Sequence, residues 1–221
     1  MKAINKNARL TLVAMVLTII TLPSVAIAQP SSLQDAARDG DLDQVEALVN
    51  SGVDINARDV NDMTALNHAA RKNQLEIVEL LLAFGADPNI PGSIINVTPL
   101  HIAARKGNLE MVKLLIGNGA ETQPAAWQGA SPMHFAARAG HTEVVAFLLE
   151  SGADANFMDH EEFTPLHNSS HNGHMEITKL LLANGANPTA TTYSGSTPVI
   201  CAQDNNHVEI VELLNSAISS Q

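Results

Sequence analysis

The stretch TPLHIAARKG, from Thr98 to Gly107, decides the fold, because altered copies of it return along the chain at a nearly constant interval. The threonine position is taken in turn by Thr64, Thr98, Ser131, Thr164 and Thr197, at spacings of 34, 33, 33 and 33 residues. A further step of 33 residues back from Thr64 reaches Ser31, so six copies are expected. This period is typical of a solenoid, in which each unit buries its apolar face against its neighbours.

Each copy is expected to contain two helices. Thr98 is placed to cap the first helix with its hydroxyl, and Pro99 stands at the first helical position, where its missing N–H is not needed. Gly107 ends that helix, since a helix stop requires the left-handed conformation. The other copies have Gly40, Asn73, Gly140, Gly173 and Asn206 at this place. A more apolar second helix is expected over Leu109 to Ile116, with matching runs at Leu75 to Leu82, Val144 to Leu149, Ile177 to Leu182 and Val208 to Leu214.

Turn-rich segments such as Gly152-Ala153-Asp154-Ala155-Asn156 lead from each second helix to the next copy. Together with the TPLH stretch they resemble the ankyrin repeat, whose consensus includes TPLHxAA, then GHxEIV, then LLxxGADxN. The resemblance covers nearly all of the chain after residue 28 and implies an all-α ankyrin-repeat solenoid of about six helix-turn-helix units with short hairpin loops. We therefore expect an ankyrin repeat domain over residues 29–221, with approximate repeats at 31–59, 60–93, 94–126, 127–159, 160–192 and 193–221.

The first 28 residues have the features of a cleavable secretory signal. Lys2, Lys6 and Arg9 precede an apolar run from Leu10 to Leu22, and the small-residue exit Ala26-Ile27-Ala28 follows. An uncleaved N-terminal anchor is the alternative, but the apolar run is short for a membrane span. Cys201 is the only cysteine, so the exported chain has no internal disulfide, which favours a bacterial periplasm over a disulfide-rich extracellular setting.

Charge limits the partners that the exported chain could bind. Cleavage removes three basic residues and no acidic one, leaving nine Lys and Arg against 23 Asp and Glu, a formal charge of −14. Such an acidic chain is not expected to bind nucleic acid or an anionic membrane through its overall field. We expect a monomer that binds another protein.

No catalytic motif stands out in the sequence. It contains no GxSxG, HExxH, phosphate-binding glycine loop or paired cysteines, so we expect neither an enzyme nor a cofactor or metal. Six of the nine histidines follow the repeat register, at the TPLH position and after the helix-ending residue, which favours structural roles. The alternative is a metal-binding protein or enzyme built on His167, His171 and His174.

One column of side chains calls for a functional explanation. Seven residues after the threonine position the chain has Arg38, Arg71, Arg105, Arg138, His171 and Asp204, and Lys72 and Lys106 stand one residue further on. Six of the nine basic residues after residue 28 thus fall in two adjacent columns. The ankyrin resemblance implies that these columns line the concave groove. Simple complementation of the helix dipole is the alternative explanation for a cation at a helix end.

Next to this column the resemblance places the hairpin tips, occupied by Val60, Ile94, Trp127, His160 and Tyr193, with Met63, Val97 and Phe163 on the same edge. Amphipathic aromatic residues are frequent binding anchors. We therefore expect a partner's acidic segment to bind at Arg38, Arg71, Lys72, Arg105, Lys106, Arg138, Trp127, Phe163 and Tyr193.

The leading hypothesis is a periplasmic, non-enzymatic adaptor. The chain is similar to small exported bacterial ankyrin proteins associated with periplasmic catalase, which implies a role in oxidative-stress defence. Two further possibilities are an immunity protein that neutralises a periplasmic toxin and a purely structural spacer.

Overall fold

The computed structural model describes residues 32–92, 96–124 and 126–220. These ranges form twelve α-helices and one short 3-10 helix, and their only β-type pairing is an antiparallel bridge between Gly92 and Val97. The all-α repeat fold is thus confirmed. None of the helices in these ranges combines the length and apolar character needed to cross a membrane. The expected signal peptide, residues 1–28, lies outside the described residues.

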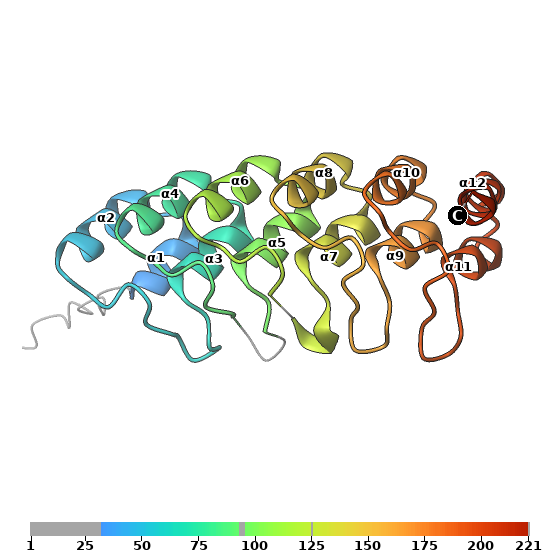
Figure 1. Ribbon diagram of the computed structural model, residues 1–221. Helices are drawn as coiled ribbons and strands as arrows, with labels where there is room; N and C mark the ends of the chain where they lie inside the picture. The colour runs from blue at the N-terminus through green and yellow to red at the C-terminus, as the bar shows by residue number, and fades with distance from the viewer. Residues whose placement is uncertain (1–31, 93–95, 125, 221) are drawn as a thin grey trace, which may run out of the picture. The chain divides into compact units, whose positions relative to one another are not determined.

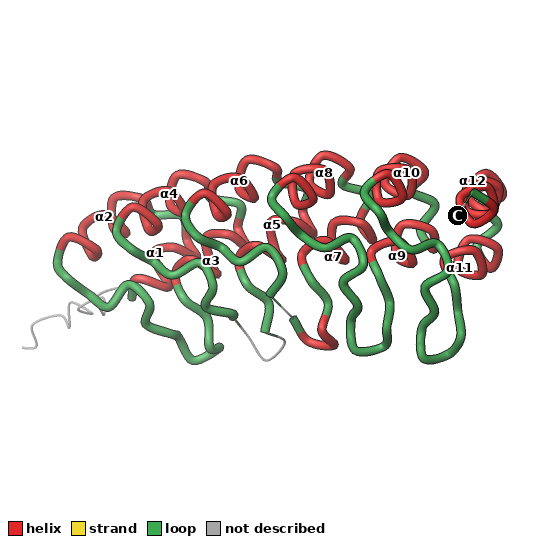
Figure 2. The backbone as a smooth tube through the Cα atoms, in the orientation of Figure 1, coloured by secondary structure: helices red, strands yellow, loops and turns green. Residues whose placement is uncertain are grey.

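The helices alternate between two rows (Figure 1). The first helices of the pairs form the lower row in that view: α1 (Leu33–Asp39), α3 (Ala65–Lys72), α5 (Pro99–Lys106), α7 (Pro132–Ala139), α9 (Pro165–His171) and α11 (Pro198–Asp204). The second helices form the upper row: α2 (Leu42–Asn50), α4 (Leu75–Ala83), α6 (Leu109–Gly117), α8 (Thr142–Glu150), α10 (Met175–Ala183) and α12 (Val208–Ser219). Figure 2 shows loops extending below the first-helix row, and one of them contains the 3-10 helix η2 (Trp127–Gly129).

The core is one continuous cluster that lies both within each helix pair and between neighbouring pairs. Each first helix from α3 to α9 packs against the first helices on both sides and against its own second helix. Alanines such as Ala69, Ala103 and Ala136 are buried on the first helices and allow a close approach. The second helices bury leucines that include Leu81, Leu115 and Leu148. A fully buried leucine contributes about 1.5–3 kcal/mol, so the stack holds together through contacts between repeats.

The threonine column caps the first helices, as the sequence predicts. Thr64 Oγ1 accepts a hydrogen bond from the Asn67 N–H at 3.2 Å. Thr98 forms a capping box with His101, whose Nδ1 accepts from the Thr98 N–H at 3.2 Å and lies 2.9 Å from its hydroxyl. The opening copy differs from the expectation, because α1 is capped by Ser32 and the expected Ser31 lies outside the described residues. The first helix there begins one residue later in the repeat register than α3, because its N-cap is Ser32.

The TPLH histidines tie each repeat to the next. Their Nε2 atoms lie 3.1, 2.9 and 3.2 Å from carbonyl oxygens 29 residues further on, in the pairs His101–Ala130, His134–Phe163 and His167–Ser196. Because each Nδ1 accepts from a backbone N–H, the proton of the neutral ring sits on Nε2 and is donated to that carbonyl. Burial lowers the pKa of all three rings, that of His101 to about 4. The structural role expected of these histidines is confirmed.

A second set of histidines, which lie just after the first helices, forms hydrogen bonds to the preceding repeat. His141, His174 and His207 donate from Nε2 to the carbonyl oxygens of Arg105, Arg138 and His171 at 3.0, 3.1 and 3.1 Å. The backbone at all six predicted helix stops is left-handed, with φ between 60° and 85°. At Gly140 a side chain would also lack space, because a Cβ there would come within 2.7 Å of the His174 ring.

Candidate functional site

The predicted basic columns lie in the last turns of consecutive first helices. Arg71 and Lys72 end α3, Arg105 and Lys106 end α5, and Arg138 is the last residue but one of α7. All five side chains are exposed. Since α5 packs against both α3 and α7, equivalent residues of neighbouring helices are separated by about the interaxial distance of packed helices, 8–10 Å.

Three hollows follow one another along this row and share lining residues. The first, of about 630 Å³, lies between Arg38 and Arg71, and the second, of about 400 Å³, lies between Arg71 and Arg105. The third, of about 280 Å³, adjoins Arg138. Arg71 lines both the first and the second hollow, whereas Val97 lines both the second and the third. The structure therefore brings the four arginines to one connected groove, which we call the cation groove.

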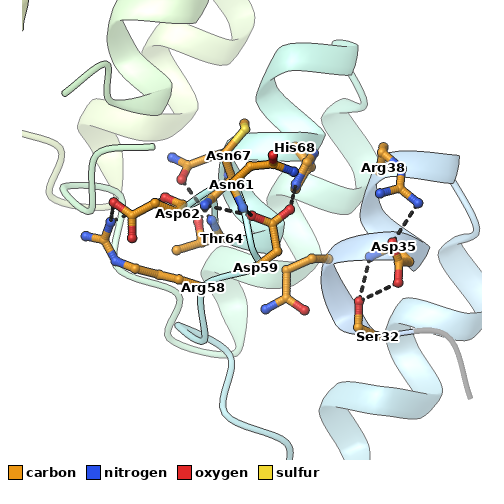
Figure 3. A network of polar contacts seen from close by, with 12 residues as sticks. Ser32, Asp35, Arg38, Arg58, Asp59, Asn61, Asp62, Thr64, Asn67 and His68 are labelled. Atoms are coloured by element: carbon orange, nitrogen blue, oxygen red, sulfur yellow. Dashed lines mark hydrogen bonds and ion pairs between the residues drawn. The ribbon is translucent and has the colours of Figure 1, made fainter. Parts of the chain in front are cut away.

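Arg38 differs from the other arginines of the row. Its guanidinium forms ion pairs with Asp35 at 2.6 Å and Asp39 at 3.4 Å, and the first of these pairs is drawn in Figure 3. Within the part of the chain that the structure describes, no carboxylate oxygen lies within 4.0 Å of Arg71, Arg105 or Arg138. Arg38 is thus paired with carboxylates of its own helix, unlike the other arginines of the row, and its part in partner binding stays a prediction.

Apolar side chains line the same groove. Met63 is buried, and its Sδ lies 3.9 Å from Arg71 Nη1. Ile102 and Phe135 lie three residues before Arg105 and Arg138, on the same face of α5 and α7, and both line the second hollow. The Phe135 ring packs edge-on against the His101 ring, with centroids 5.4 Å apart. Sequence reasoning missed these two groove residues, although their spacing of three from the arginines was a usable signal.

Phe163 lies differently from an exposed anchor. Its side chain is half-buried and its ring packs edge-on against His167, with centroids 5.5 Å apart. Its carbonyl also accepts the hydrogen bond from His134. Phe163 therefore joins neighbouring repeats, and it does not line any of the three hollows of the groove.

The hairpin-tip side chains that the structure describes, Val60, His160 and Tyr193, are all exposed. Val60 is fully exposed and 76% of Tyr193 is exposed. Neighbouring tips join through their backbones, since the His160 N–H donates to Gln128 O at 2.7 Å and the Tyr193 N–H donates to Glu161 O at 3.2 Å. The side chain of Trp127 and the whole of Ile94 lie outside the described residues.

Acidic and neutral groups end the positive row at its C-terminal side. Asp159 lines the third hollow together with Arg138, and its carboxylate accepts the N–H groups of Glu161 and Phe163, each at 2.9 Å. In the next column position His171 Nδ1 accepts from the Asn205 amide at 2.9 Å. The positive part of the groove therefore extends from Arg71 to Arg138.

A buried Asp59–His68 pair underlies the N-terminal end of the groove (Figure 3). Asp59 Oδ2 lies 2.8 Å from His68 Nε2, and both side chains are largely buried. Burial acts to raise the pKa of Asp59, but hydrogen bonds from the Met63 N–H, the His68 ring and the Asn61 N–H outweigh it and lower this pKa to about 2. The pair fixes the hairpin next to Arg71.

The three histidines of the metal alternative do not converge. Both ring nitrogens of His167 are engaged by Thr164 and Ser196, while His174 Nε2 bonds to Arg138 O and His171 Nδ1 accepts from Asn205. Among the described residues, no group of three or more His, Cys, Asp or Glu side chains is placed to hold a metal ion. The geometry gives this alternative no support.

The repeat geometry agrees with a comparison against protein families. The model for ankyrin repeats (3 copies) matches residues 15–92, 33–126, 90–159 and 133–220, which together cover most of the chain. The chain belongs to the ankyrin repeat family. No curated protein matches it in a sequence search. Ankyrin repeats are in general non-enzymatic modules of protein–protein interaction, so this chain is a protein-binding module.

Proposed function

We propose that this ankyrin repeat protein is an adaptor that is exported to the periplasm and binds an acidic segment of another protein in the cation groove. The observation that carries the proposal is the exposure of Arg71, Arg105 and Arg138 in one groove, with no carboxylate of the described chain paired to them. In a chain with a formal charge of −14 after cleavage, unpaired cations gathered on one face favour an acidic ligand.

The separation of charge between the two helix rows supports this. Every second helix carries an acidic residue in its first turn: Asp43, Glu76, Glu110, Glu143, Glu176 and Glu209. The first helices α1, α3, α5 and α7 carry Arg or Lys residues in their last turns. An acidic partner is therefore repelled by the second-helix row and attracted to the cation groove.

The apolar residues of the groove have a necessary role in this binding. An exposed ion pair contributes about 0–1 kcal/mol, so the three unpaired arginines alone give weak and salt-sensitive binding. Contacts to Phe135 and Val97, which are only half-buried, supply the remaining affinity, because they bury apolar surface next to the charges. Tyr193 and Trp127 extend the proposed site along the hairpin tips.

A matched pair of double variants tests the proposal. Arg71→Glu with Arg105→Glu and Lys113→Glu with Lys179→Glu change the net charge equally, but Lys113 and Lys179 lie on the second helices α6 and α10. With the purified protein immobilised in periplasmic extract, the first variant should lose the captured acidic partner and the second should keep it. Equal capture by both variants, with helical circular dichroism unchanged, would contradict groove binding.

Export and physiological role need separate tests. Fractionation of cells that express the full chain should recover a product shortened by residues 1–28 from the periplasm. The resemblance to exported ankyrin proteins associated with catalase supports a role in oxidative-stress defence, so a deletion strain should be sensitive to peroxide. Sensitivity to toxin-bearing competitors without peroxide sensitivity would favour the immunity role instead.

A further inference from the structure

The unpaired arginines of the cation groove follow one another at a regular interval. Arg71, Arg105 and Arg138 hold equivalent places in α3, α5 and α7, and α5 packs directly against both α3 and α7. Packed helices lie about 8–10 Å apart, so a ligand along the groove meets a guanidinium at about this interval. A bound segment uses all three charges only if its acidic side chains return to the same face with the same step.

Regular chain conformations differ in whether they meet this condition. In a β-strand, side chains on one face are about 6.7 Å apart at a spacing of two residues and about 13 Å apart at four, so neither spacing fits. A polyproline II helix has three residues per turn and rises about 3.1 Å per residue, so every third side chain lies on one face about 9.3 Å further on. An α-helix returns to one face after seven residues, about 10.5 Å, and so meets the distance condition as well.

The second basic column distinguishes the two conformations that fit. Lys72 and Lys106 lie next to Arg71 and Arg105 and are likewise exposed without a carboxylate within 4.0 Å in the described ranges. An α-helix uses its backbone carbonyls internally, whereas a polyproline II segment leaves them all free to accept hydrogen bonds. Only the polyproline II segment therefore gives the lysine column a regular set of acceptors.

The two ends of the row set the length of the bound segment. Arg38 is held by Asp35 and Asp39, and beyond Arg138 the groove wall includes Asp159. Three arginines remain, so the segment needs three acidic residues spread over seven positions. The side chains between them face apolar groove residues such as Met63, Val97 and Phe135, which favours small apolar residues there.

We propose that the cation groove selects a polyproline II segment of a partner protein with Asp or Glu at every third position, in the pattern acidic-x-x-acidic-x-x-acidic. The proposal rests on the proposed function and adds to it the spacing and the conformation of the ligand. Such segments suit disordered acidic regions, because unfolded chains already populate this conformation.

Four labelled peptides test the spacing with the full exported chain. PDAPDAPDA carries the predicted pattern, PDADADPAP has the same composition with acidic residues at alternate positions, and PSAPSAPSA has no charge. An alanine-rich helical peptide with three Asp residues seven positions apart tests the other geometry. By fluorescence anisotropy at low salt, PDAPDAPDA should bind about tenfold more tightly than PDADADPAP, which engages one arginine fully instead of three. Arg105→Gln should remove most of this difference and Lys113→Gln should leave it unchanged.

The possible outcomes test the spacing rule, the conformation of the ligand and the proposed function separately. Equal binding of the two acidic proline-containing peptides overturns the spacing rule but leaves an acidic ligand in place. Tighter binding of the helical peptide overturns the polyproline II conformation. If no acidic peptide binds more tightly than PSAPSAPSA, both the spacing rule and the proposed function fail.

Discussion

Replacing Ser170 by alanine should stabilise the protein, because its hydroxyl is buried without a partner. Ser170 lies in α9 with no exposed surface, and its Oγ has no hydrogen-bond partner among the described residues. The equivalent residues Ala70, Ala104 and Ala137 are buried alanines, so a methyl group fits this place in the stack. An unsatisfied buried polar group costs about 1–3 kcal/mol, and Ser170→Ala should recover at least about 1 kcal/mol of it.

The neighbouring serine provides the control. Ser169 Oγ lies 3.0 Å from Thr178 Oγ1 and 3.2 Å from Leu166 O, so Ser169→Ala removes a satisfied group and should destabilise the protein by about 0.5–1.5 kcal/mol. Urea unfolding followed by far-UV circular dichroism gives both changes, and a gain of 1 kcal/mol corresponds to a rise in Tm of about 2–4 °C for a domain of this size. If Ser170→Ala were neutral or destabilising, the reasoning from the buried hydroxyl would be refuted.

The remaining predictions concern pH, backbone strain and the end of the basic row. Between pH 6.5 and about 4 the unfolded chain binds a proton that the folded His101 ring, with its pKa of about 4, does not. The His101 ring alone should therefore lower the free energy of unfolding by about 3 kcal/mol as the pH is lowered through this range. Urea titrations at several pH values measure this slope, and His101→Asn should flatten it, because Asn67 forms the same capping box with Thr64 through a side chain that does not titrate. Glu162→Gly should raise the free energy of unfolding by about 0.5–1 kcal/mol, since Glu162 has a left-handed backbone with φ 64°, and an unchanged Tm would contradict this. Arg105→Gln should weaken the binding of PDAPDAPDA more than Arg38→Gln does, because Arg38 is already paired with Asp35, and anisotropy titrations that show equal losses would contradict this.

The fold is predictable from the sequence because the same structural positions recur in each repeat, so that a substitution in one copy does not hide the pattern. The left-handed helix stops, the capping threonines and the histidine ties all lie where the register places them. The repeat period identifies these positions because each one meets the same backbone requirement in every copy. In the opening copy the register holds at the left-handed Gly40, but the capping residue is Ser32, one residue after the position that the period predicts.

The candidate site was less predictable, because pairing and packing differ between copies. Arg38 has a carboxylate three residues before it, and Arg71, Arg105 and Arg138 have His68, Ile102 and Phe135 at that place. The positive charge of the column alone therefore does not show which arginine is paired with a carboxylate. Phe163 was expected to be a binding anchor, but its packing against His167 depends on how two neighbouring hairpins meet, which periodicity alone does not give.

The ties that hold the stack together also fix the spacing of the proposed binding groups. The carbonyl oxygens of Arg105 and Arg138 accept hydrogen bonds from His141 and His174 of the following repeat. The backbone of each of these arginines is thereby hydrogen-bonded to the next helix pair. A ligand with the matching step then binds without first ordering the backbone of the groove, which lowers the entropic cost of association. His141→Ala should therefore weaken the binding of PDAPDAPDA even though His141 does not line the groove.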